Sequence, residues 1–211
     1  MSANLLLAAV ILLNFLLVAT GRAKQLISRV SLQGVVLGSI LLLINDKWPF
    51  HVLLMAVSTI AIKGAVIPWM LNKALNRLRQ AQEPTPYVSY TLSLVLLAGG
   101  TFLAFLLAQR LPLQTGALGT LFIPASLATL FTGFLLLTTR RRALLQVIGY
   151  LVLENGVYLF SLLLVKNMPL LVETGVLLDL VVGIFVMAIV MNHLQQAFES
   201  QDTDKMTHLR E

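Results

Sequence analysis

Long apolar stretches, separated by short polar connections, run through almost the whole chain. Seven of them are close to the roughly 20 residues that an α-helix needs to cross about 30 Å of hydrocarbon. No water satisfies the backbone there, so each stretch is expected to be α-helical. The predicted spans are residues 4–20, 26–44, 50–71, 87–108, 116–138, 144–165 and 170–195. The pattern predicts an all-α, polytopic membrane protein with seven transmembrane helices.

The connections between these spans alternate in positive charge. Three basic residues lie in or beside each of connections one, three and five, whereas connections two, four and six carry one each. Basic residues favour the cytoplasmic side, so the N-terminus is predicted outside and the C-terminus in the cytoplasm. The richer set is Arg22, Lys24, Arg29, Lys73, Arg77, Arg79, Arg140, Arg141 and Arg142, and the poorer set is Lys47, Arg110 and Lys166.

Prolines and glycines organise the predicted spans further. Pro84 and Pro86 interrupt the longest connection and mark a possible boundary between units. Gly34 and Gly38 form a small-xxx-small face suited to close helix packing, although ordinary glycine usage explains them equally well. Pro124 is expected to bend the fifth span. The predicted units are residues 1–80 (three helices), 87–110 (a linking helix), 116–195 (three helices) and 196–211 (a polar cytoplasmic tail).

Composition excludes several classes of protein. The 211 residues are 58% hydrophobic and 11% charged, less than half the charged fraction of a soluble domain. The net charge of +6 comes from residues that flank the spans, so it indicates topology and not nucleic-acid binding, and Arg140, Arg141 and Arg142 are mainly a topological anchor. The absence of cysteine excludes disulfides and iron–sulfur clusters. No nucleotide-binding, protease or metal motif is present, so no active site, metal site or cofactor site is expected in this chain.

Acidic residues inside the last two spans are the main candidates for chemistry. A charge at the bilayer centre costs about 2.5–3.5 kcal/mol on insertion scales, so an acid there indicates function. At 1.5 Å per residue, Glu154 lies about 15 Å from one surface and Asp179 about 14 Å from the other, at similar depth on antiparallel helices. Glu173 is shallower, and a solvated rim carboxylate is as good an explanation for it as a role in proton exit.

The alternative for the two deep acids is a structural role. Glu154 has Tyr150, Asn155 and Tyr158 nearby as hydrogen-bonding partners. Intramembrane hydrogen bonds usually contribute only about 0.6–2 kcal/mol, which does not clearly offset the cost of burial. Proton or ion transport is therefore favoured over a structural pair.

Lys63 lies in the third span and adds a buried charge of opposite sign. It is about 20 Å from the outer end, too deep to reach that side easily. One interpretation is a buried cation that biases a neighbouring carboxylate. The other is a lysine that extends to the cytoplasmic face.

The last three spans resemble the three-helix K-type subunit of respiratory complex I and its antiporter relatives. The resemblance rests on the arginine turn, the Ile-Gly pair at residues 148–149 followed by Glu154, and Asp179 four positions before Gly183. Counted from Gly149, Glu154 lies about one helical turn later than the glutamate of that family.

Most of the chain is similar to hydrogenase-4 component E, a membrane subunit of group 4 [NiFe]-hydrogenase and formate hydrogenlyase complexes. The shared features are L-E-N-G at residues 153–156, L-V-E-x-G at 171–175 and Lys63 five residues before Pro68. The resemblance implies a bacterial or archaeal cytoplasmic membrane, with antiporter-like and quinone-site-type membrane subunits as partners. It also implies that the nickel–iron centre and the iron–sulfur clusters belong to other chains.

Together these features favour a non-catalytic subunit that takes part in proton translocation, with Glu154, Asp179, Lys63 and Glu173 on the path. Three alternatives remain open: an assembly subunit that conducts no ions, a subunit of a multisubunit sodium/proton antiporter, and an independent secondary transporter. The last predicts internal repeats with broken helices, and none is evident in the sequence.

Overall fold

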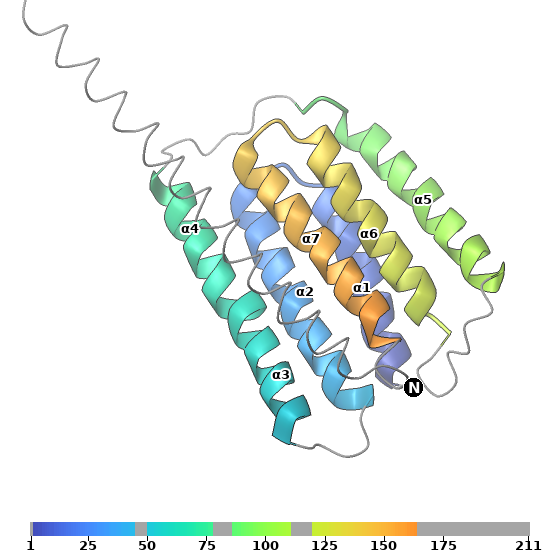
Figure 1. The fold of residues 1–211 in the computed structure, drawn as a ribbon. Helices are drawn as coiled ribbons and strands as arrows, with labels where there is room; N and C mark the ends of the chain where they lie inside the picture. Colours follow the sequence, from blue (N-terminus) through green and yellow to red (C-terminus); the bar gives the residue numbers. More distant parts are fainter. Residues whose placement is uncertain (1, 45–49, 78–85, 111–119, 164–211) are drawn as a thin grey trace, which may run out of the picture.

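The computed structural model describes residues 2–44, 50–77, 86–110 and 120–163, and all regular elements in these ranges are helical (Figure 1). A π-helical segment, η1, joins α3 and α4 into one continuous rod. The elements are α1 (Ser2–Val18), α2 (Ala23–Ile44), α3 (Phe50–Ala61), η1 (Ile62–Val66), α4 (Ile67–Arg77), α5 (Tyr90–Arg110), α6 (Phe122–Thr139) and α7 (Ala143–Leu162).

The helices follow the first six predicted apolar stretches. Five helical rods in the described ranges are long and apolar enough to span a membrane, and α1 is slightly shorter at 17 residues. The protein is therefore a multi-pass membrane protein. The seventh predicted span, residues 170–195, lies outside the described residues, so the count of seven and the sides of the two termini stay predictions.

Helices α6 and α7 form the most closely packed pair, and glycine makes their approach possible. A methyl group added at Gly133 of α6 would lie 2.4 Å from the backbone nitrogen of Leu153. On α7, one added at Gly156 would lie 2.6 Å from the backbone nitrogen of Leu130. Glycine at these positions lets the two backbones come close, as small residues do between membrane helices.

This close packing predicts a specific effect of one methyl group. Gly133→Ala is expected to lower stability by about 1–3 kcal/mol, because α6 and α7 must move apart to admit the new atom. Thermal unfolding of the purified chain in detergent measures the effect. The matched control is Gly99→Ala on α5, where an added methyl group meets nothing within 4 Å. Equal effects of the two substitutions would contradict the packing described here.

The small-residue face on α2 is confirmed as a packing face. A methyl group at Gly34 would lie 2.7 Å from Cβ of Lys63, and one at Gly38 would lie 2.3 Å from Cγ1 of Ile60. Both glycines therefore bring α2 against the α3–η1 rod. This contact fixes the position of Lys63 relative to the rest of the bundle.

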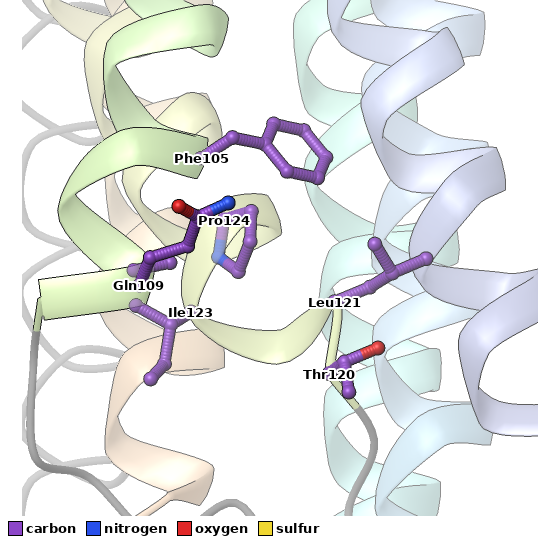
Figure 2. Close-up of a pocket in the computed structure, with 7 residues that line it drawn as sticks. Phe105, Gln109, Thr120, Leu121, Ile123 and Pro124 are labelled. Carbon is purple, nitrogen blue, oxygen red and sulfur yellow. The ribbon is translucent and has the colours of Figure 1, made fainter.

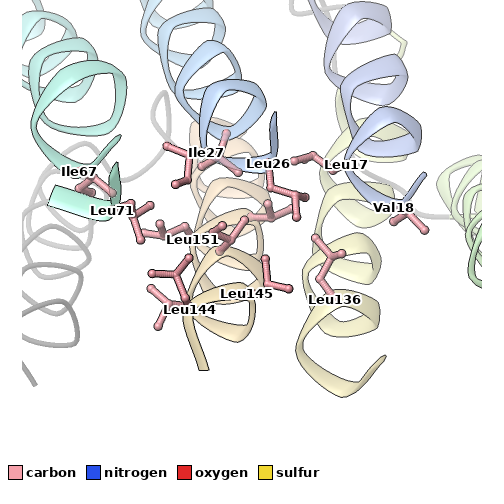
Figure 3. Packing of buried hydrophobic residues seen from close by; sticks show 14 of the residues in the cluster. Leu17, Val18, Leu26, Ile27, Ile67, Leu71, Leu136, Leu144, Leu145 and Leu151 are labelled. Atoms are coloured by element: carbon pink, nitrogen blue, oxygen red, sulfur yellow. The ribbon is translucent and has the colours of Figure 1, made fainter. Parts of the chain in front are cut away.

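Two apolar clusters fill the bundle, one toward each end. The first lies at the end with the α1–α2 and α6–α7 connections, which is uppermost in Figure 1, and includes Leu17, Leu26, Leu71, Leu136 and Leu144 (Figure 3). The second lies toward the other end and includes Leu7, Ile40, Val52, Phe122 and Leu159. Each cluster combines residues from most of the helices, so the described helices form a single bundle.

Two expectations from the sequence need correction. Helix α6 begins at Phe122, so Pro124 lies in its first turn and does not bend the middle of a span. Proline is tolerated in the first turn, where its missing N–H would have no intrahelical partner. The third rod also continues as helix to Arg77, six residues beyond the predicted end.

The arginine run is more than a topological anchor, because Arg140 is buried. Its Nη2 donates hydrogen bonds to the carbonyl oxygens of Val18, at 2.9 Å, and Thr20, at 3.3 Å. Its guanidinium group also lies 4.6 Å from the ring centre of Tyr90. A cation at the carboxyl end of α1 satisfies free carbonyl groups and interacts favourably with the helix dipole.

Candidate functional site

A chain of polar side chains crosses the bundle between the two apolar clusters. It starts at Lys63 of η1, whose Nζ donates to Oδ1 of Asn155 on α7 at 3.1 Å. Nδ2 of Asn155 donates to Oε1 of Gln33 on α2 at 3.2 Å, and Nε2 of Gln33 donates to Oδ1 of Asn14 on α1 at 2.9 Å. Nδ2 of Asn14 then donates to Oγ1 of Thr129 on α6, also at 2.9 Å. Four consecutive hydrogen bonds thus connect five helical elements.

This polar chain is enclosed by the protein. The exposed fraction of Asn14, Gln33, Thr129 and Asn155 is 1% or less, whereas Lys63 is partly buried. Buried polar groups are costly unless they are hydrogen-bonded, and each amide here has partners for both its oxygen and its nitrogen. The arrangement is therefore a built polar layer inside an otherwise apolar bundle.

Local backbone structure places Lys63 at one end of the chain. In η1 the N–H of Ile67 bonds to the carbonyl of Ile62, five residues back. Pro68 has no N–H to offer the carbonyl of Gly64 four residues earlier, and the hydroxyl of Ser31 on α2 donates to that carbonyl at 2.6 Å instead. Such π-helical turns are frequent at functional sites. Here the turn directs a lysine toward α7.

The ammonium group of Lys63 points across the bundle. Besides its bond to Asn155, its Nζ lies 5.5 Å from the ring centre of Tyr158, within the range of a cation–π interaction. Both of these contacts are with α7, which agrees with a cation held beside that helix. Whether the lysine biases a carboxylate stays a prediction.

Glu154 lies on α7 directly before Asn155, and only 3% of its surface is exposed. Tyr158 follows four residues later, so it lies one turn along the same face of α7 as Glu154. Lys63 meets α7 at Asn155 and Tyr158, which are one and four positions after Glu154. Tyr150, one turn earlier, is partly buried.

The structure brings together some of the predicted site residues and leaves others untested. Lys63, Asn155 and Tyr158 meet, and Glu154 neighbours them on α7. Glu173 and Asp179 lie outside the described residues, so their positions stay predictions.

Sequence reasoning missed Asn14, Gln33 and Thr129. It weighed charged residues first, because they cost most in a membrane. Lone amides in apolar segments were a usable signal, since such groups hydrogen-bond across membrane helices. Asn14 lies in LLNFLLV and Gln33 in VSLQGVVLG.

A metal or cofactor finds few ligands in this region. Across the described ranges, no three His, Asp or Glu side chains gather at one place, and the full sequence contains no cysteine. The polar chain supplies amide and hydroxyl groups and one ammonium, and an ammonium repels a cation. Its chemistry is that of hydrogen bonding and charge stabilisation.

One cavity of about 360 Å³ lies away from the polar chain, between the end of α5 and the start of α6 (Figure 2). Its wall is mostly apolar, with Gln109 and Thr120 as polar members. It does not include any residue of the polar chain. The remaining lining residues are Phe105, Ala108, Leu121, Ile123 and Pro124.

Comparison with known proteins agrees with the resemblance read from the sequence. The family model of NADH-ubiquinone/plastoquinone oxidoreductase chain 4L matches residues 121–211. An uncharacterised protein of Mycobacterium tuberculosis is 30% identical over 206 residues, which cover 95% of this chain and 92% of that protein. Hydrogenase-4 component E of Escherichia coli K12 is 25% identical over 162 residues, which cover 76% of this chain and 74% of the relative. No solved structure matches the chain.

The matches differ in how much of the chain they cover. The chain 4L model begins one residue before α6 and includes α7 with Glu154 and Asn155. The relatives matched over most of the chain extend the similarity well beyond that segment. This chain belongs to the hydrogenase-4 component E family, and its part from residue 121 onward is of the NADH-ubiquinone/plastoquinone oxidoreductase chain 4L type.

Proposed function

We propose that this chain is a membrane subunit of a complex I-like [NiFe]-hydrogenase complex. It contributes ionisable residues in the membrane interior to proton translocation, which is driven by redox chemistry in partner subunits. The partners are antiporter-like and quinone-site-type membrane subunits, and the membrane is the cytoplasmic membrane of a bacterium or an archaeon. The names of the relatives and the long apolar helices of this chain support this assignment.

The observation that carries the proposal is the position of Lys63 beside α7. Its ammonium group reaches Asn155, the residue next to the buried Glu154, from a rod on the other side of α2. An interior cation favours the ionised form of a nearby carboxylate, while burial favours the neutral form. Opposing influences of this kind let a carboxyl group exchange a proton when neighbouring charges change.

In this proposal the acids and the lysine have different roles. Glu154 and Asp179 take up and release protons at mid-membrane, and Lys63 is the cation that biases them. Glu173, nearer the end of its span, lies toward the exit of the path. Asn155, Tyr150 and Tyr158 support the site with hydrogen-bonding groups and an aromatic ring. The energy of moving one charge across 100 mV is about 2.3 kcal/mol, which is similar to the cost of about 2.5–3.5 kcal/mol for a charge at the bilayer centre.

A subunit that only supports assembly is the second candidate, and the polar chain favours it. Bonds that join Lys63, Asn155, Gln33, Asn14 and Thr129 hold five helical elements together. A subunit of a multisubunit sodium/proton antiporter is a further alternative, because the chain 4L type also resembles such subunits. Substitutions that preserve shape but remove a titratable group separate conduction from scaffolding.

Asp179→Asn in the intact complex tests the proposal. The complex is expected to assemble, because an amide has nearly the same shape as a carboxylate. Hydrogen-dependent proton uptake by inverted membrane vesicles is expected to fall several-fold, because an amide carries no exchangeable charge. Co-purification of the other membrane chains reports assembly. If proton uptake and assembly both match those of the unsubstituted complex, Asp179 is not on a proton path.

A further inference from the structure

The direction of the hydrogen bonds in the polar chain is fixed at both of its ends. The amine of Lys63 donates to Oδ1 of Asn155, so Asn155 presents its oxygen to the lysine and its nitrogen to Gln33. At the other end, the hydroxyl hydrogen of Thr129 is used in a 2.7 Å bond to the carbonyl of Ala125, so Thr129 must accept from Asn14. Between these ends, every amide donates away from Lys63 and accepts on the side nearer to it.

This uniform direction has an electrostatic consequence. The amides of Asn155, Gln33 and Asn14 are aligned head to tail, with the carbonyl end of each dipole toward the ammonium group. Hydrogen bonds in such a chain strengthen one another, and their effect is larger in a medium of low polarity. Because these residues are almost fully buried, water does not screen them.

We propose that Asn14, Gln33 and Thr129 are positioning residues that act through Asn155 to hold the amine of Lys63 against α7 inside the membrane. The chain replaces, for this one ammonium group, part of the solvation that water would supply. Asparagine and glutamine side chains do not ionise in the physiological pH range, so the chain stabilises the cation without carrying protons to α1 and α6. The inference rests on the proposed function in one respect only, namely that Lys63 influences the acids of the proton path.

Other charged or titratable groups lie on the helices around Lys63. Among the described residues, Tyr158 of α7 is 5.5 Å away by its ring centre, and Glu154 precedes Asn155 on the same helix. On α2, which packs against η1, the basic Arg29 is next to Val30, and its Nη1 donates to the carbonyl of Leu16. On α4, Lys73 lies 5.1 Å from the ring centre of Trp69. The amide chain differs from all of these in being neutral and oriented.

The test follows how firmly the amine of Lys63 is held, by its chemical reactivity. Acetic anhydride acylates an amine that is free to react, and mass spectrometry of the full complex in detergent gives the acylated fraction of Lys63 after a set time at one pH. Gln33→Met keeps the volume of the side chain but interrupts the chain after Asn155. The rate of acylation of Lys63 is expected to rise several-fold, because its amine is no longer held firmly against Asn155.

A control and a second variant keep the test decisive. Thr132→Val removes a buried hydroxyl on α6 that bonds within its own helix, and it is expected to leave acylation of Lys63 unchanged. Thr129→Val acts at the far end of the chain and is expected to shift acylation in the same direction as Gln33→Met, but less. It gives an answer even if Gln33→Met fails to fold. Unchanged acylation in a folded Gln33→Met or Thr129→Val complex would overturn the inference.

The positioning role and the proposed function can be disproved separately. If Asp179→Asn leaves translocation intact while Gln33→Met shifts the acylation of Lys63, the proposed function is wrong and the positioning role stands. If Gln33→Met leaves acylation unchanged while Asp179→Asn abolishes translocation, the positioning role is wrong and the proposed function stands.

Discussion

A complex that carries Glu154→Gln is expected to assemble and to oxidise or evolve hydrogen, but to lose proton translocation by a factor of about 10². The factor is the usual effect of removing a positioned group that exchanges a proton. Glutamine has nearly the same size and stays polar, so a site that is 3% exposed keeps its packing. In the proposed function, the substitution removes the ability of residue 154 to take up and release a proton. Acidification of inverted vesicles, measured together with hydrogen turnover, separates the two activities.

Glu154→Asp is the matched control for that prediction. It keeps a carboxyl group at position 154 but withdraws it by one methylene group, so partial translocation is expected. A structural role would order the variants differently, because glutamine preserves the length of the side chain and aspartate does not. Wild-type translocation in Glu154→Gln would remove this residue from the proton path.

The largest expected effect on stability comes from Arg140→Met. The substitution removes the donor to the carbonyls of Val18 and Thr20 and leaves that end of α1 without a buried cation. Hydrogen bonds to charged groups contribute about 1.5–3 kcal/mol each, so a loss of about 3 kcal/mol is expected. Less protein should accumulate in the membrane, and thermal unfolding in detergent should begin well below the wild-type temperature.

Arg141→Met in the same connection separates this effect from topology. Both substitutions remove one positive charge from the same side of the membrane, so they weaken the orientation signal equally. Arg141 is exposed and its described contact is the ring of Tyr87, 4.4 Å from its guanidinium group. Its substitution is expected to change stability by less than about 1 kcal/mol. Equal losses for the two variants would mean that Arg140 acts through charge alone.

Much of the fold was predictable because the membrane restricts the choice of structure. Apolar length located six helices, with most ends within a few residues, since every backbone group in hydrocarbon must be bonded internally. Helix ends were harder. Residues up to Arg77 stay helical, because a helix can continue beyond the apolar part of its sequence. Pro124 was expected to bend a helix because the start of α6 at Phe122 was not known from the sequence.

The candidate site was predictable only in part, because a sequence shows which residues are costly to bury in a membrane but not which residues they contact. Lys63 and Glu154 were predictable because they are charged residues in apolar spans. The partner of Lys63 was not, because Asn155 is 92 positions away and the contact depends on the π-helical turn and on Gly34. Arg140 illustrates the same point from the other side. Its charge indicated topology, whereas its burial depends on the carbonyls of Val18, at the end of α1, and Thr20, just beyond it, which are 122 and 120 positions away.

The level of the polar layer has a consequence for work against the membrane potential. Glu154 lies eleven residues after Ala143, about 16 Å along α7, which is near the middle of a hydrocarbon layer of about 30 Å. A proton that moves sideways at this level follows an equipotential and does almost no electrical work. A proton that leaves toward either surface crosses about half of the field, or roughly 1.2 kcal/mol at 100 mV. In the proposed function, the voltage would therefore oppose entry and exit, and leave transfer between neighbouring subunits nearly free.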